Sequence, residues 1–143
     1  MTKSTNKFGK LEKFELIYAV SYLITGKLLY EFIGSGLASA VLFLCMAVFT
    51  VLLIVLRKHH TYWQDKPLLT VLSIYYKSLT YTIVIFTMCN YPGKAALNIT
   101  ALASFFIYSV LAYFNRTQYN QMLNAYLYLQ MVAFAKYGLL EDW

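Results

Sequence analysis

The chain has 143 residues, of which 60% are hydrophobic and only 13% are charged, and its formal net charge is +6. Soluble domains carry roughly 25% charged residues, so this composition excludes an ordinary soluble globular domain. The basic residues gather at the ends of apolar runs and not along one face, which excludes a nucleic-acid-binding surface and is typical of membrane proteins. We therefore expect a single all-α integral membrane domain over residues 1–143, with the lipid bilayer as a partner.

The first two apolar runs predict a helical hairpin over residues 14–56. Residues 1–13 are rich in lysine and predict a cytoplasmic tail before the first span, not a cleaved signal. The runs over 14–33 and 37–56 are each close to the ~20 residues that a helix needs to cross a bilayer. Gly34-Ser35-Gly36 between them predicts the reversal of the chain.

The next two apolar runs predict a second hairpin over residues 67–114. Its helices are expected over 67–89 and 95–114, on either side of Asn90-Tyr91-Pro92-Gly93-Lys94. Proline cannot extend the incoming helix and glycine tolerates the reversal, so this segment predicts a tight turn.

Beyond the second hairpin, the pattern indicates a C-terminal amphipathic helix over residues 117–140. Gln118, Gln121, Asn124 and Gln130 alternate there with apolar side chains. So many amides do not suit a lipid-facing span, and we expect an interfacial or cytoplasmic helix. A fifth span is the alternative.

The distribution of basic residues predicts that both termini are cytoplasmic, in a bacterial inner membrane. The side that holds the termini carries nine of them: Lys3, Lys7, Lys10, Lys13, Arg57, Lys58, Lys66, Arg116 and Lys136. The opposite side holds Lys94 alone.

The two hairpins also predict an internal repeat. A shift of 59 residues superposes Tyr22 on Tyr81, Gly34 on Gly93 and Arg57 on Arg116. Both copies would run in the same direction, which makes the pair a parallel repeat.

Three charged residues within the predicted spans are candidates for a polar site: Lys27, Glu31 and Lys77. Lys27 and Glu31 are four residues apart and able to pair on one helix face near the turn, or to form a polar site between helices. Lys77 either reaches back to the cytoplasmic headgroups or has a functional role. Glu15 is its candidate partner within the chain, because it is the acid at matching depth.

Rows of small residues predict where helices approach one another closely, within the chain or between subunits. The candidates are Gly34, Gly36, Ala38 and Ala40 in the first hairpin and Gly93, Ala96, Thr100 and Ser104 in the second. The 14 tyrosines are interpreted as interface anchors and helix packing. The depths of Cys45 and Cys89 argue against a disulfide, so both are expected to be free.

The segment Phe86-Thr87-Met88-Cys89-Asn90-Tyr91-Pro92-Gly93-Lys94-Ala95 resembles the hairpin signature of small inner-membrane proteins related to the gliding-motility and type IX secretion motor, its L subunit. In that family an apolar helix runs through Phe-Lys and then His-Trp-Pro-Gly-Ala into a second helix. The family's lysine falls on Thr87 or Leu28 and its glutamate on Phe105 or Met46, so the motor residues are not matched. The resemblance implies hairpin architecture and self-association in the membrane.

No catalytic set, phosphate-binding loop or cofactor motif stands out, and His59-His60 is interpreted as part of a basic cap and not as a metal site. We expect a non-enzymatic scaffold, accessory subunit or immunity-type protein without metal or cofactor, acting through helix–helix association. Its partners would be other membrane proteins or further copies of itself. The alternative is a small oligomeric channel or transporter with Lys27, Glu31 and Lys77 along the path.

Overall fold

In the computed structural model, the described residues are 10–58, 67–114, 128–130 and 133, and all elements among them are helical. The four long helices are α1 (Lys10–Ile33), α2 (Ser35–Lys58), α4 (Pro67–Met88) and α5 (Lys94–Phe114). Each is long and apolar enough to cross a membrane, which confirms four apolar helices at the positions of the predicted spans. The first helix begins four residues before the predicted boundary at residue 14, inside the segment expected to be a tail.

The turn between α1 and α2 consists of one residue. Gly34 has a φ of +78°, a left-handed conformation that side chains with a Cβ disfavour, and α2 begins at the next residue. Gly93 plays the same part before α5, with a φ of +89°. Each glycine carbonyl accepts the first hydrogen bond of the following helix, from Ala38 N and Leu97 N, both at 3.1 Å.

The end of α4 is a Schellman motif built around an asparagine. Asn90 has a φ of +51°, and its N–H donates to the carbonyl of Thr87, while the N–H of Tyr91 donates to the carbonyl of Phe86. The Phe86 and Tyr91 rings pack edge to face, with centroids 5.5 Å apart, as the apolar contact of such a motif requires. Pro92 then prevents the helix from resuming.

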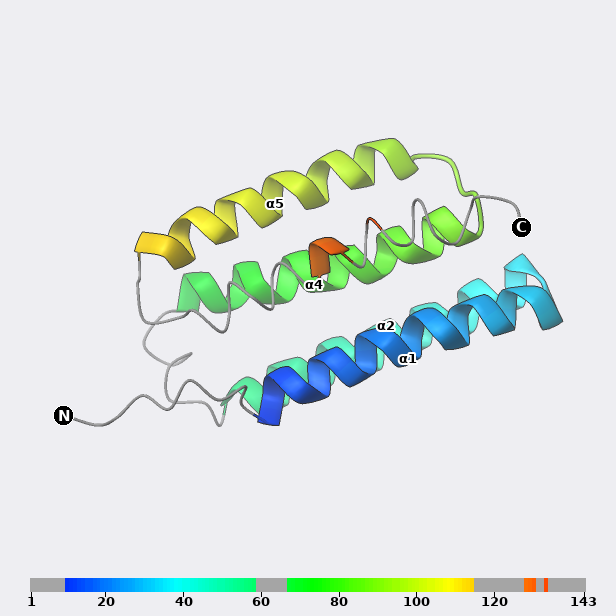
Figure 1. The fold of residues 1–143 in the computed structure, drawn as a ribbon, viewed down its shortest axis with the longest axis horizontal. Coiled ribbons are helices and arrows are strands. Elements are labelled where there is room, and N and C mark those ends of the chain that lie inside the picture. Colours follow the sequence, from blue (N-terminus) through cyan, green and yellow to red (C-terminus); the bar gives the residue numbers. More distant parts are fainter. Residues whose placement is uncertain (1–9, 59–66, 115–127, 131–132, 134–143) are drawn as a thin grey trace.

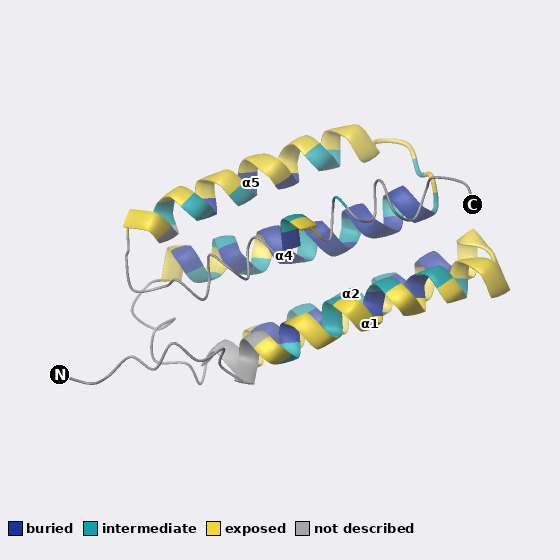
Figure 2. Ribbon diagram, in the orientation of Figure 1, coloured by how far each residue is buried: buried dark blue, intermediate teal, exposed yellow. Residues whose placement is uncertain are grey.

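Helix α4 is the centre of the bundle (Figure 1). It contacts α1, α2 and α5, whereas α5 contacts α4 alone among the four helices. Figure 2 shows the same contrast in burial, because dark blue runs along α4 while α1 and α5 are yellow on their outer sides. The central helix therefore joins the two hairpins.

The core between α1, α2 and α4 is aromatic. The rings of Tyr22, Phe49 and Tyr81 are buried and pack with centroids 4.7 Å apart for Tyr22–Tyr81 and for Phe49–Tyr81. The hydroxyl of Tyr18 donates to the carbonyl of Cys45 at 2.6 Å, and that of Tyr22 donates to the carbonyl of Leu42 at 3.2 Å. These bonds tie α1 to the backbone of α2, so the tyrosines at these positions serve helix packing as expected.

Polar contacts between the hairpins lie at two levels. In the middle of the bundle, Thr50 Oγ1 and Ser78 Oγ are 2.9 Å apart. At the turns, Ser39 Oγ and the Tyr91 hydroxyl are 2.8 Å apart, and Cys89 Sγ donates to the carbonyl of Ser35 at 3.6 Å. Both turns therefore lie on the same side of the bundle.

Candidate functional site

The candidate site is an ion pair in the interior of the bundle. Lys77 Nζ lies 2.7 Å from Glu15 Oε2, and the side chains are 0% and 1% exposed. Lys77 stands ten residues beyond Pro67, ~15 Å along α4, so its ammonium is far from the start of the helix. The pair joins α1 of the first hairpin to α4 of the second, as the matching depths predicted.

Two aromatic rings lie close to the ammonium group of Lys77. Lys77 Nζ lies 5.9 Å from the ring centroid of Tyr76 and 5.4 Å from that of Tyr128, within the range of cation–π attraction. The Tyr128 hydroxyl is 3.5 Å from that of Tyr81, whose ring lies against Tyr22. A buried charge needs an opposite charge and further polar or polarisable neighbours, and this site supplies both.

Tyr128 places part of the C-terminal region inside the bundle. Most of the helix predicted over 117–140 lies outside the described residues, but residues 128–130 are helical and Tyr128 is 3% exposed. Its ring packs edge to face on Tyr76 and Tyr81, at the depth of the ion pair. At Tyr128 the chain therefore packs against α4 inside the bundle, and the rest of the predicted amphipathic helix stays a prediction.

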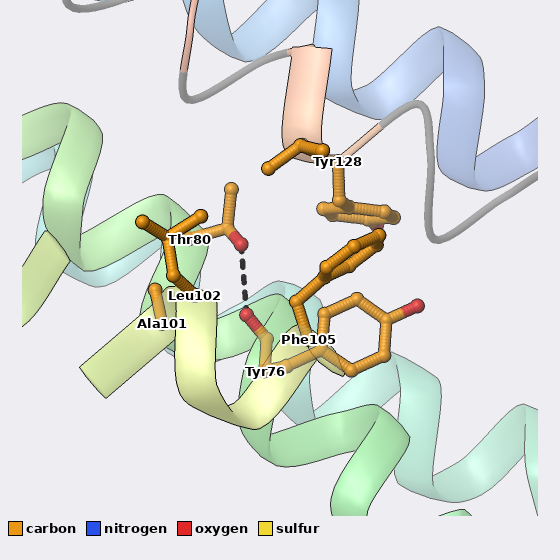
Figure 3. A pocket seen from close by; sticks show the side chains of 7 residues that line it. Tyr76, Thr80, Ala101, Leu102, Phe105 and Tyr128 are labelled. Atoms are coloured by element: carbon orange, nitrogen blue, oxygen red, sulfur yellow. Dashed lines mark hydrogen bonds between the residues drawn. The ribbon is translucent and has the colours of Figure 1, made fainter. Parts of the chain in front are cut away.

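A small apolar cavity lies between α4, α5 and Tyr128, beside the Tyr76 and Tyr128 rings (Figure 3). Its volume is about 10 Å³, which is room for about one water molecule. The labelled residues that line it are Tyr76, Thr80, Ala101, Leu102, Phe105 and Tyr128. The Thr80 hydroxyl donates to the Tyr76 carbonyl at 2.8 Å, so this polar group of the lining is bonded to the backbone of its own helix. The cavity is too small and too apolar for an aqueous path.

The three sequence-predicted charges do not meet. Lys77 does not reach back to the headgroups, because its ammonium is held at Glu15. Lys27 is half-buried and Glu31 is exposed, and no ion pair joins them in the part of the chain that the structure describes. The predicted Lys27–Glu31 pair is therefore not formed. Both side chains stand on the outer part of α1, where each can extend to the surroundings instead of to the other.

The predicted rows of small residues are mostly on the outside. Ala38 is fully buried and Ser104 is 7% exposed, but the remaining six candidates are exposed: Gly34, Gly36, Ala40, Gly93, Ala96 and Thr100. The glycine that does lie in a close helix contact is Gly26, which the sequence pattern did not single out. An added Cβ there would meet Met88 at 3.2 Å and Leu42 at 3.4 Å.

The cysteine and histidine side chains that could bind a metal ion form no group in the described part of the chain. Cys45 and Cys89 are both free, as predicted, and burial raises the pKa of the Cys89 thiol. His59 and His60 lie outside the described residues. Among the residues that are described, no group of three histidine, cysteine or acidic side chains is close enough to hold a metal ion.

The residues around the ion pair were only partly predictable. Depth alone pointed to Glu15, but nothing in the spacing pointed to Tyr76, Tyr81 and Tyr128. Compared with models of protein families, with curated proteins and with solved structures, the chain gives no match. The family resemblance of the turn segment therefore stays an expectation, and function is argued from the site itself.

Proposed function

We propose that the protein is a non-enzymatic integral membrane protein that acts through helix–helix association, as a scaffold, an accessory subunit or an immunity-type protein. The observation that carries this proposal is the buried ion pair. Lys77 and Glu15 neutralise each other at 2.7 Å, and the cavity beside Tyr76 and Tyr128 has a volume of about 10 Å³. With these two charges engaged inside the bundle, the chain has its apolar outer helix faces left for interactions.

The proposed topology is four spans arranged as two tandem parallel repeats, with both termini in the cytoplasm of a bacterial cell and the spans in its inner membrane. The nine basic residues on the side of the termini support the orientation. Gly34 and Gly93 support the repeat, because they are 59 residues apart, have the same left-handed backbone and directly precede α2 and α5.

A small oligomeric channel or transporter is the second candidate function. The observation that favours it is the buried pair itself, because an ionisable side chain within a membrane is by default a candidate for ion or proton movement. Ser73, one turn before Lys77, is also fully buried and adds a polar group on the same side of α4. Of the three charges assigned to a path, only Lys77 points into the bundle, so Lys27 and Glu31 would have to line it between subunits.

Reconstitution separates the two candidates. Purified full-length protein is placed in liposomes that carry a pH or potential gradient, and ion flux is compared with that of the double variant Glu15→Gln/Lys77→Met, which removes both charges together. The scaffold proposal expects no flux above that of empty liposomes, together with defined assemblies after mild detergent extraction, read by native mass spectrometry. Flux in the natural protein that the double variant lacks would overturn the scaffold proposal in favour of the channel.

A further inference from the structure

The outward face of α1 carries a seam with the spacing of a coiled coil. Its residues are separated by four, three, four, three and four positions: Lys13, Ile17, Val20, Ile24, Lys27 and Glu31. This alternation keeps one stripe facing a partner helix along the whole length of two left-handed supercoiled helices. Ile17, Val20 and Ile24 are 66%, 49% and 58% exposed, so the described chain leaves the middle of the stripe open, while Lys27 near its end is half-buried.

The charges at the end of the seam distinguish it from an ordinary lipid-facing surface. Lys27 and Glu31 are opposite in sign, lie one turn apart and make no ion pair in the described structure. A charge that faces hydrocarbon costs up to ~2.5–3.5 kcal/mol at the centre of a bilayer, so membrane helices normally pair such groups or turn them away from lipid. A surface that carries both charges is complementary to a second copy of itself.

We propose that α1 is the dimerisation helix of this protein, packed in parallel against α1 of a second copy. Around a twofold axis along the membrane normal, Lys27 of each copy faces the partner's Glu31, which gives two equivalent ion pairs. Because the two helices run in the same direction, the partner's Glu31 stands one turn, ~6 Å, from the level of Lys27, and the long lysine side chain spans this difference. This inference rests on the proposed function, because it names the partner of the proposed helix–helix association.

The second hairpin shows what the same positions look like when they are covered. The residues 59 positions after Ile17 and Ile24 are Tyr76 and Ile83, which are 2% and 1% exposed in the centre of the bundle. In α4 these two positions are covered within the chain, whereas in α1 Ile17 and Ile24 are 66% and 58% exposed. A second copy supplies the missing neighbour.

Disulfide cross-linking in native membranes tests the seam. In full-length protein with Cys45 and Cys89 replaced by alanine, single cysteines are introduced by Val20→Cys or Ile24→Cys. Thr25→Cys is the matched control, because Thr25 is also exposed but lies about 100° around the helix from Ile24. We expect the two seam variants to form dimers at least about tenfold faster than the control. Equal cross-linking of all three, no dimer, or cross-links to a protein of another mass would overturn the inference.

A charge exchange tests the ion pairs. Lys27→Glu places four acids at the seam and is expected to lower the dimer fraction by about tenfold, the effect of ~1.4 kcal/mol. Lys27→Glu/Glu31→Lys restores complementarity and is expected to restore the dimer. If the Lys27→Glu monomer has an unchanged melting temperature, the variant still folds. If neither variant changes the dimer fraction, the proposed ion pairs are overturned.

Failure of the proposed function can be told apart from failure of the dimer. Flux in liposomes would contradict the proposed function and leave the cross-linking and charge-exchange results unchanged. A co-purifying protein without cross-links would contradict only the dimer.

Discussion

Helix α1 is the first helix of the first hairpin, and α4 is the first helix of the second. The two differ in burial, because α1 is mostly exposed and α4 is half buried. Half of the spanning segment of α4 is buried, against 11% of that of α1. Each contributes one member of the ion pair. Among the four described helices, α4 with Lys77 contacts three others, whereas α1 with Glu15 contacts α2 and α4. A membrane helix of similar hydropathy can therefore be either the core of a bundle or its edge.

The largest expected effect concerns the ion pair that joins the two helices. Lys77→Met leaves the Glu15 carboxylate buried without its partner, which costs about 3–5 kcal/mol, so we expect loss of the folded monomer from detergent extracts. Glu15→Gln/Lys77→Met removes both charges and is expected to cost little. Thermal melting of the purified protein measures both. Equal stability of single and double variants would show that the pair contributes nothing to joining the hairpins.

A pair of isoleucines 59 residues apart tests the contrast in burial directly. Ile83 in α4 is 1% exposed, so Ile83→Ala leaves a cavity and is expected to destabilise the monomer by about 2–5 kcal/mol. Ile24 in α1 is 58% exposed, and Ile24→Ala is expected to change monomer stability by less than about 0.5 kcal/mol. The measurement is the unfolding free energy at low protein concentration. Similar losses at both positions would mean that α1 is covered within the monomer.

The smallest effect concerns Gly26, the glycine of α1 that lies in a close contact with its neighbouring helices. Gly26→Leu would force atoms against Met88 and Leu42 and is expected to cost about 1–3 kcal/mol. Gly36→Ala is the control, because nothing lies within 4 Å of the added methyl group and alanine favours a helix. Thermal melting compares the two variants. A stable Gly26→Leu protein would show that α1 and α4 separate easily at this level.

The elements of this fold were predictable because bilayer thickness fixes the length of an apolar run and Pro92, Gly34 and Gly93 mark the reversals. The faces were not. In a soluble helix polar residues mark the outside, but lipid is as apolar as a helix interface, so this signal is missing in α2 and α5. That is why the rows through Gly36 and Ala96 were candidates for packing although the structure leaves both exposed.

The residues of the candidate site likewise fall into those that the sequence could predict and those that it could not. Charge is rare within a membrane, so Lys77 stood out in the sequence, and depth alone was enough to find Glu15. Tyrosine is common in this chain, and its role depends on which way each ring points. The cap on α4 was missed for a local reason, since Asn90 takes the left-handed conformation that the Pro-Gly pair led us to expect only at Gly93.

The one-residue link at Gly34 leaves almost no protein beyond the ends of α1 and α2. On that side of the bundle, the connections between the four helices amount to Gly34 and residues 89–93. Among the described residues, an antibody, a protease or a water-soluble ligand arriving there would find only these short connections to bind.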